Sequence, residues 1–336
     1  MALWLAVAVA AGFAVTNGLH DAANAIAALV ATRTATPAAA LALATVFNVL
    51  GPLLVGAAVA DTVAGIVQVG PSATVEVLGA ALTAAVLWNL LTWRLGLPSS
   101  SGHALVGGLV GAALLEGGAA AVNWGGFDGL RPVGVIGVLV ALAVSPLAGL
   151  VAGGAADRAG RRATRRATRR IGGPIRAGLW GTSAALAFSH GANDAAKSVG
   201  IIASLLVAGG EIADLGATPV WVTLASAIAL TLGTALGGWT IVYTIGRRIF
   251  RIRPLDGVAS SGGSAAVILG ASLLGAPVST TQVVASSVVG TGLGRHRVHR
   301  IRWTAVAGVG AAWLVTLPVC ALGAVALTPL WRWLAG

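Results

Sequence analysis

The sequence predicts an all-α membrane protein with many spans, built from two inverted-topology repeats. Three observations support this fold class: the 336 residues are 57% hydrophobic, only 9% are charged, and the polar motifs occur twice in the same order. An average soluble protein carries about 25% charged residues, so this chain has too few to cover a soluble surface. The composition excludes a cytosolic enzyme, a secreted domain and a disordered chain. A transmembrane barrel is excluded as well, because its strands would alternate polar and apolar residues.

Ten apolar elements are expected, because about 20 apolar residues span a bilayer as a helix. The first half is expected to hold elements at residues 2–32, 37–60, 72–93, 98–115 and 132–154. The second half is expected to hold elements at 177–207, 219–246, 255–274, 277–293 and 303–328. Some of these elements are expected to be re-entrant or broken, as in other transporters built from repeats.

Uncharged runs define most of these elements. They cover Met1–His20, Thr34–Ala60, Val133–Ala156, Val220–Gly246 and Trp303–Leu330. The first run resembles the core of a signal peptide, but no basic residue precedes Arg33, so we read it as a retained membrane element. The element at 72–93 would span about 33 Å as a helix. The elements at 98–115 and 277–293 begin at a proline, which fits a first helical turn.

Basic residues set the expected domain division and orientation. Residues 1–156 form the first repeat, 157–176 a basic cytoplasmic linker with eight arginines, and 177–336 the second, inverted repeat. With the linker in the cytoplasm, 18 of the 21 cations fall on that side, in agreement with the positive-inside rule. Both termini then face outward from the cell membrane. Because the basic blocks are explained in this way, no nucleic-acid partner is expected; the expected surroundings are the lipid bilayer.

Two pairs of matched motifs indicate the repeats. The segment from Asn17 to Ile26 matches the segment from His190 to Val199 at an offset of 173 residues. The segment from Gly96 to His103 matches the one from Gly275 to Gln282 at an offset of 179. An odd number of elements in each half inverts the second half, and inverted repeats are typical of secondary transporters with a midplane site.

Asp21 and Asp194 are carboxylates inside apolar segments, where an ionisable group is expensive and indicates function. Each sits after a glycine, Gly18 or Gly191, and beside small alanines, and such a stretch could unwind and free backbone carbonyls for a cation. Carboxylate and amide oxygens suit a hard cation such as Na⁺, or a proton on the aspartate. The expected ligands of the coupling ion are Asp21, Asn24, Asn193, Asp194 and Gln282, with Asn17 as a further oxygen donor.

Lys197, the only lysine, takes the position of Asn24 in the second half. It could stand where a second coupling ion would bind, or it could form a fixed internal salt bridge with an aspartate. His20 and His190 could carry a proton or hydrogen-bond a backbone carbonyl. All three are candidate charge partners. No His-Glu-x-x-His motif is present, so the sequence predicts no metal site with assurance.

Hydroxyl residues follow the two prolines that begin the elements at 98 and 277. They can cap a helix start, and the free N–H groups and dipole there attract an anion. Both motifs lie about 80 residues after an aspartate motif, which favours anion binding over plain capping. The expected phosphate-binding residues are Asp21, Asp194, Ser99, Ser100, Ser101, Ser279, Thr280 and Thr281.

These paired motifs resemble the inorganic phosphate transporter family of ion-coupled symporters. That family repeats a Gly-x-Asn-Asp-x-Ala-Asn-Ala-like signature, which the segment from Gly191 matches closely. The first copy departs at His20, and the second departs at Lys197 and Ser198. The resemblance implies phosphate as substrate, H⁺ or Na⁺ as the driving ion, a homodimer and an elevator-like exchange of access. The lysine favours H⁺ coupling and, by analogy, a metal–phosphate complex as cargo.

The sequence therefore predicts a secondary active symporter that moves inorganic phosphate, free or with a metal, together with H⁺ or Na⁺. It is expected to be no enzyme and to need no cofactor besides the coupling ion. A passive anion channel, or a permease for another oxyanion such as sulfate, is the alternative. An anion channel would line its path with cations or neutral donors, and two acidic residues there would repel its ion.

Overall fold

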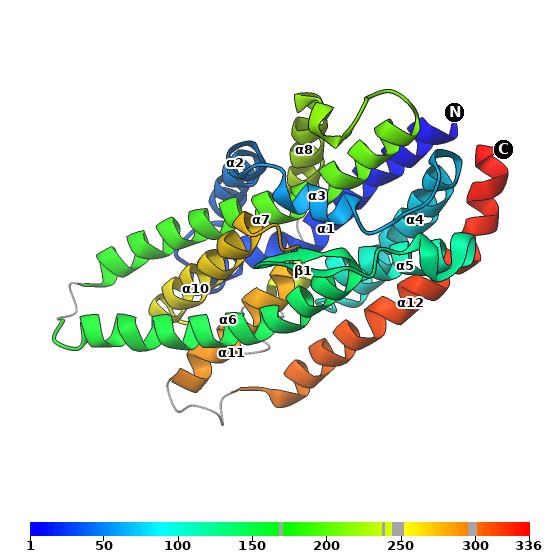
Figure 1. Ribbon diagram of the computed structural model, residues 1–336. Coiled ribbons are helices and arrows are strands. Elements are labelled where there is room, and N and C mark those ends of the chain that lie inside the picture. Colours follow the sequence, from blue (N-terminus) through cyan, green and yellow to red (C-terminus); the bar gives the residue numbers. More distant parts are fainter. Residues whose placement is uncertain (168–170, 237–238, 244–251, 295–300) are drawn as a thin grey trace.

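The computed structural model describes residues 1–336 except 168–170, 237–238, 244–251 and 295–300 (Figure 1). The first half contains α1 (Ala2–Ala31), α2 (Pro37–Val55), α3 (Ala58–Ala64), α4 (Pro71–Leu95), α5 (Ser101–Gly117) and α6 (Gly134–Thr164). Between α5 and α6 lie the 3₁₀ helix η1 (Gly118–Ala121) and an antiparallel hairpin of β1 (Gly126–Asp128) and β2 (Arg131–Val133). The second half contains α7 (Gly172–Ala208), η3 (Leu215–Ala217), α8 (Val220–Leu236), α9 (Trp239–Tyr243), α10 (Pro254–Leu273), α11 (Thr280–Gly294) and α12 (Trp303–Ala335).

The expected all-α membrane fold class is confirmed. Among the described residues, six helical segments are long and apolar enough to cross a membrane: Ala2–Ala31, Pro37–Val55, Pro71–Leu95, Ser101–Ala121, Gly134–Thr164 and Trp303–Ala335. Helix α7 has 37 residues, but its polar motif lowers the hydropathy of its centre. The protein is therefore a multi-pass membrane protein.

Most of the described residues in the basic linker expected over 157–176 are helical. Helix α6 continues to Thr164, and α7 already begins at Gly172. Asp157 and Arg161, four residues apart on α6, form a bidentate ion pair with N–O distances of 2.7 to 2.9 Å. Such an i,i+4 pair supports a helix, and arginine and alanine have high helix propensity. A run of basic residues therefore does not by itself distinguish a loop from a helix.

Other expected elements differ from the prediction in their bounds. The element at 37–60 divides into α2 and α3 at Gly56, whose φ of 94° suits glycine. The element at 219–246 contains α8 and α9, and its residues 237–238 and 244–246 lie outside the described residues. The turns between α4 and α5 and between α10 and α11 are not helical. Helices α5 and α11 begin at Ser101 and Thr280, each three residues after the proline at which the element was expected to begin.

The two termini lie at one end of the molecule, and α6 and α7 meet at the other end (Figure 1). This arrangement agrees with the threading expected from the charges, although the side of the membrane stays a prediction. Several of the basic residues in that argument lie outside the described residues: Arg169, Arg170, Arg247, Arg248, Arg251, Arg295, Arg297 and Arg300.

Packing between the halves follows a regular pattern. Helix α1 packs on α8 while α2 packs on α7, α5 packs on α12 while α6 packs on α11, and α4 packs on α12 while α6 packs on α10. The two contacts of each pair are related by a shift of six in helix number: α1 corresponds to α7, α2 to α8, and α4, α5 and α6 to α10, α11 and α12. Replacing each helix by its counterpart turns one contact of a pair into the other. These are the contacts that the predicted repeats would form; the division into repeats itself stays a prediction.

Glycines allow the closest of these contacts. A Cβ at Gly191 of α7 would overlap the carbonyl oxygen of Asn48, and a Cβ at Gly51 of α2 would overlap that of Phe188. Gly18 and Gly233 make the same reciprocal contact between α1 and α8. The aspartate motifs are therefore held on helices whose backbones touch those of their neighbours.

We expect Gly191→Ala to lower the stability of the protein by about 1–3 kcal/mol, because the methyl group forces α2 and α7 apart. Gly181→Ala is the matched control, since a Cβ there on the same helix meets nothing within 4 Å. It should be neutral or stabilising by up to about 1 kcal/mol, because alanine has the higher helix propensity. Thermal unfolding in detergent measures both, and equal midpoints for the two variants would contradict the close-contact argument.

Apolar clusters lie on both sides of the polar motifs. Helix α1 places Phe13 in one cluster and Ile26 in the other, and α7 places Ile201 in the first and Leu186 in the second. The polar residues 17–24 and 190–198 lie between these positions. The fold thus holds a polar layer midway between two apolar ones.

Candidate functional site

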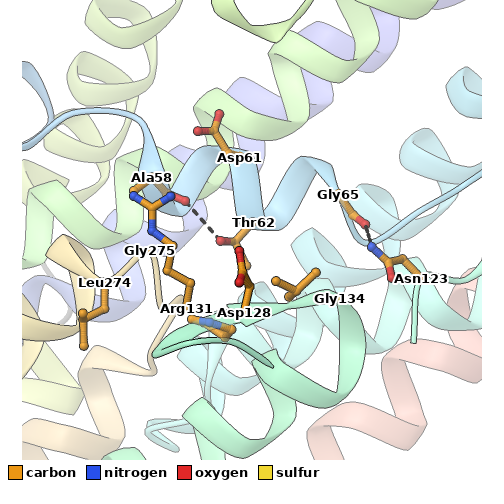
Figure 2. A pocket seen from close by; sticks show the side chains of 12 residues that line it. Ala58, Asp61, Thr62, Gly65, Asn123, Asp128, Arg131, Gly134, Leu274 and Gly275 are labelled. Carbon is orange, nitrogen blue, oxygen red and sulfur yellow. Dashed lines mark hydrogen bonds between the residues drawn. The ribbon is translucent and has the colours of Figure 1, made fainter. Parts of the chain in front are cut away.

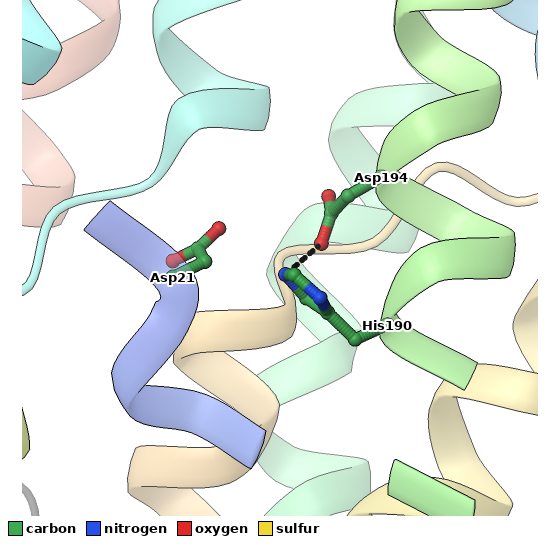
Figure 3. Close-up of side chains that lie close together, drawn as sticks. All are labelled: Asp21, His190 and Asp194. Carbon is green, nitrogen blue, oxygen red and sulfur yellow. Dashed lines mark ion pairs between the residues drawn. The ribbon is translucent and has the colours of Figure 1, made fainter. Parts of the chain in front are cut away.

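The structure brings the two aspartate motifs together. Carboxylate oxygens of Asp21 and Asp194 and a ring nitrogen of His190 all lie within 4.8 Å of one another (Figure 3). Asp21 comes from α1, and the other two come from α7. All three side chains are at most 1% exposed, so these charges lie in the protein interior. The facing carboxylates form a single site, as the matched motifs predict.

Asp21 accepts hydrogen bonds from the starts of two short helices. Thr281 at the start of α11 donates to Oδ1, and the hydroxyl oxygen of Thr280 lies 3.4 Å from Oδ2. Ser101 at the start of α5 donates to Oδ2 at 3.5 Å. The N-termini of α5 and α11 therefore both reach this carboxylate, and their free N–H groups and dipoles favour negative charge.

Asp194 has a cationic partner on its own helix. Lys197 donates from Nζ to Oδ1 of Asp194 and, at 2.8 Å, to the carbonyl oxygen of Val278. Oδ2 accepts from Thr280 at 2.8 Å and lies 3.1 Å from Nε2 of His190. The ammonium of Lys197 thus pairs with Asp194, and the central site contains two carboxylates and one ammonium. With neutral histidines, the site carries one uncompensated negative charge, which a bound cation would balance.

The residue before each aspartate holds a hairpin turn. His20 Nε2 lies 3.1 Å from the carbonyl oxygen of Leu97, and Asn193 Nδ2 donates at 3.1 Å to that of Ala276. Both carbonyls immediately precede the prolines of the two hairpins. The glycines before them, Gly96 and Gly275, have φ angles of 66° and 70°. The departure from asparagine at His20 therefore keeps the same structural contact.

Several buried amide oxygens near the aspartates have no hydrogen-bond partner in the described part of the chain. They are Oδ1 of Asn17, Asn24 and Asn193 and Oε1 of Gln282. Asn24 does use its Nδ2, which donates to the hydroxyl of Thr281 at 3.2 Å. Unpaired buried acceptors are costly, so a ligand is expected to satisfy them. Oxygen acceptors suit a hard cation.

The predicted hydroxyl residues divide into two groups. Ser101, Thr280 and Thr281 bond to the carboxylates, as described above. Ser100 and Ser279 instead cap α5 and α11, accepting from the backbone N–H of His103 at 3.2 Å and of Gln282 at 3.4 Å. Ser99 lies 3.2 Å from Nε2 of His20. In this conformation only the later hydroxyls in each motif face the aspartates.

The expected unwinding at the aspartates is wrong. Helices α1 and α7 are continuous across Asp21 and Asp194. The interruptions lie instead in the α4–α5 and α10–α11 turns, and those turns supply the carbonyl oxygens, such as that of Val278. A proline needs no N–H partner and disfavours helix at the residue before it, so each turn breaks at its proline motif.

Three residues of the site were missed from the sequence. Asn48 of α2 lies 3.1 Å from Nδ1 of His190, Ser272 accepts from Asn193 at 3.0 Å, and Thr92 lies 3.3 Å from Nε2 of His20. All three are buried. An isolated amide in the apolar run at 37–60 was the available signal for Asn48.

A separate polar pocket of about 220 Å³ lies between α3, the β-hairpin and the turn before α11 (Figure 2). Asp61, Asp128 and Arg131 line it, together with Leu274 and Gly275 of that turn. None of the site residues predicted from the sequence lines this pocket, which therefore neighbours the central site without being part of it.

Comparison with known proteins agrees on one family. The family model described as "Phosphate transporter family" matches residues 17–171 and 155–324. A Rhizobium meliloti (strain 1021) protein named "Probable low-affinity inorganic phosphate transporter" is 38% identical over 318 residues, covering 94% of this chain and 92% of its own. A Bacillus subtilis (strain 168) protein of the same name is 38% identical over 328 residues, covering 96% and 95%.

A solved structure has the same fold. The structure titled "The sodium-dependent phosphate transporter" superposes with a TM-score of 0.84 and covers 98% of both chains. Its sequence is 24% identical, so this likeness concerns the architecture.

Proposed function

This chain belongs to the phosphate transporter family, and from this premise we propose that it is a secondary active symporter for inorganic phosphate. The observation that carries the proposal is the pair of buried carboxylates, Asp21 and Asp194, which lie close together while only Asp194 is paired with the ammonium of Lys197. A carrier that couples an anion to a cation needs acidic groups to hold the cation. Alternating access around this central site would then move both ions in one direction.

We assign the coupling cation to the Asp21 side of the site. That carboxylate has hydroxyl neighbours but no lysine, and the unpaired oxygen of Asn24 lies on the same helix. On the Asp194 side, the ammonium of Lys197 already occupies the place of a cation. One H⁺ or Na⁺ per cycle is therefore the stoichiometry that the charges support.

Phosphate is proposed to bind where the N-termini of α5 and α11 converge. Ser101, Thr280 and Thr281 would supply hydroxyl donors there, and the two helix dipoles would stabilise the anion. Asp21, Asp194 and His190 also offer the donors of a divalent cation, two carboxylates and an imidazole. A metal that accompanies phosphate as cargo would be held by these three groups.

The membrane orientation completes the proposal. The joined ends of α6 and α7 would face the cytoplasm and both termini the outside, as the positive-inside rule indicates. The homodimer and the elevator-like movement implied by the family resemblance stay predictions. The molar mass of the purified protein in detergent measures the first.

Uptake of radiolabelled phosphate into liposomes tests the function directly. Separate gradients of H⁺ and Na⁺, each with and without Mg²⁺, identify the coupling ion and the form of the cargo. Accumulation above the outside concentration under one of these gradients supports symport. Equilibration that no cation gradient can drive uphill would instead support the passive channel.

Phosphate should be preferred over sulfate. At neutral pH phosphate carries a P–OH group that can donate to an ionised carboxylate, whereas sulfate offers only lone pairs. A charge-assisted hydrogen bond contributes about 1.5–3 kcal/mol, which corresponds to roughly tenfold to hundredfold discrimination. Competition by excess sulfate during phosphate uptake measures it, and sulfate that competes as well as unlabelled phosphate would remove the substrate assignment.

We expect Lys197→Asn to make uptake dependent on Na⁺. The variant restores the asparagine of the first motif and leaves the Asp194 carboxylate without its ammonium, so a mobile cation must replace it. Lys197→Arg keeps the charge and should leave the ion dependence unchanged. Initial rates across a range of Na⁺ concentrations at fixed pH give the comparison; parallel curves for both variants would show that Lys197 is only a structural ion-pair partner.

A further inference from the structure

A group of six buried hydroxyl residues extends from the central site toward the end where α6 and α7 meet. We call it the inner hydroxyl cluster. Its members are Ser183 on α7, Ser260, Ser261 and Ser264 on α10, and Ser287 and Thr291 on α11. None is more than 3% exposed.

Helical spacing places these hydroxyls on the same helix faces as residues of the central site, but closer to the end of the molecule where α6 and α7 meet. Ser183 lies seven residues, or two turns, before His190, and Ser264 lies eight residues before Ser272. Ser287 and Thr291 follow Thr280 by seven and eleven residues. On each of α7, α10 and α11, hydroxyl residues therefore follow the face that carries site residues, and all three rows extend toward the end where α6 and α7 meet.

Two hydroxyls of the cluster are unpartnered. Ser183 Oγ and Ser264 Oγ are fully buried and have no hydrogen-bond partner in the described part of the chain. The hydroxyl of Ser287, by contrast, crosses to α10 and donates to the carbonyl oxygen of Ser260 at 3.0 Å. Burying an unpaired hydroxyl is costly, so its presence calls for a polar species that visits it.

The corresponding positions in the first half of the chain carry no hydroxyl groups. At the motif offsets of 173 and 179 residues, the six positions correspond to Ala10, Ala81, Leu82, Ala85, Gly108 and Ala112. All six of these counterparts are buried and none has a polar side chain. Helix packing alone therefore does not require hydroxyls at these positions, since the other half packs with alanine, leucine and glycine.

We propose that the inner hydroxyl cluster is the route by which phosphate passes between the central site and the linker end of the molecule. Hydroxyl groups replace water around a tetrahedral oxyanion without binding it as tightly as a fixed cation would. The route ends near Asp157 and the partly exposed Arg161 on α6, whose neighbourhood is rich in arginine. In this structure the cluster is closed, so the route opens in another state of the cycle.

The proposal rests on the proposed phosphate transport. Its test, however, measures how fast introduced cysteines react with a thiol reagent, and this rate can be measured even if the protein does not transport phosphate. Cys320 is the only cysteine, so a Cys320→Ala parent provides a chain without thiols. Into it we would place Ser264→Cys or Ser287→Cys. The controls are Ala85→Cys, at the counterpart of Ser264, and Ala112→Cys, at the counterpart of Thr291. A membrane-impermeant thiosulfonate reagent is then added to one side of oriented vesicles at a time.

We expect Ser264→Cys and Ser287→Cys to react from the linker side, and saturating inorganic phosphate with the coupling cation to slow that reaction. The two control thiols should stay unreactive from both sides. Unreactive cluster thiols, or control thiols that react equally fast, would overturn the route. Phosphate uptake by the Cys320→Ala parent is measured separately, so a failed route is distinguished from a failed transport function.

A second measurement covers variants whose thiol perturbs folding. Ser264→Ala should lower the maximal uptake rate about threefold to tenfold, the effect of losing one hydrogen-bond partner. Its apparent affinity for phosphate should be unchanged, because Ser264 lies outside the central site. A raised KM at an unchanged maximal rate would contradict the assignment to the route.

Discussion

Asp21→Asn should abolish concentrative uptake, with the ratio of inside to outside phosphate falling to one. The substitution keeps the volume of the side chain and an oxygen that accepts from Thr281. It removes the negative charge that we assign to the coupling cation, so the downhill cation gradient no longer drives phosphate. Passive exchange of phosphate across the membrane should be the most that remains.

Glu211→Gln provides the matched control for this experiment, because that carboxylate is exposed in the segment after α7. Its accumulation ratio should equal that of the wild type. Both variants are compared at equal amounts of folded protein, judged by size-exclusion chromatography. Uphill accumulation by Asp21→Asn would remove this residue from coupling.

Asp194→Asn should have the largest effect on stability. It leaves the buried ammonium of Lys197 with the Val278 carbonyl oxygen but without its carboxylate. Removing one partner of a buried ion pair typically costs about 3–5 kcal/mol. The variant should therefore unfold at a clearly lower temperature in detergent, and its yield of folded protein should fall.

A double variant separates this charge effect from packing. Asp194→Asn combined with Lys197→Met removes both charges and keeps most of the side-chain volume, so most of the stability should return. Lys197→Met alone leaves two facing carboxylates and should depend on added cation for its stability. A double variant as unstable as Asp194→Asn would show that the lost stability comes from something other than the unpaired ammonium.

The sequence was sufficient to predict that Asp21 and Asp194 meet. Carboxylates are expensive in an apolar segment, and matched positions in two predicted inverted repeats are expected to bring such groups together. The sequence was insufficient to predict the backbone conformation around these aspartates. Gly18 and Gly191 suggested unwound helices, whereas their role is the contact with Leu230 and Asn48, a feature of tertiary packing.

The hydroxyl motifs show a second reason why sequence reasoning stopped short. Three consecutive hydroxyls after a proline look equivalent in the sequence, but the helix start makes them different. Ser100 and Ser279 satisfy backbone N–H groups, and only the residues that follow turn toward the carboxylates. The contact of Asn48 with His190 joins residues 142 positions apart, which no local pattern encodes.

The ion pair of Lys197 also has an electrical consequence. Because this positive charge is covalently attached, it would return with the proposed carrier in every cycle and would never be released. The empty site, with two carboxylates and one ammonium, carries one net negative charge. Loading one monovalent cation together with the monoanion H₂PO₄⁻ leaves that net charge unchanged. In the proposed symport, both reorientation steps would then move the same charge through the bilayer, so uptake of the monoanion would be electroneutral and the membrane potential would neither drive nor oppose it.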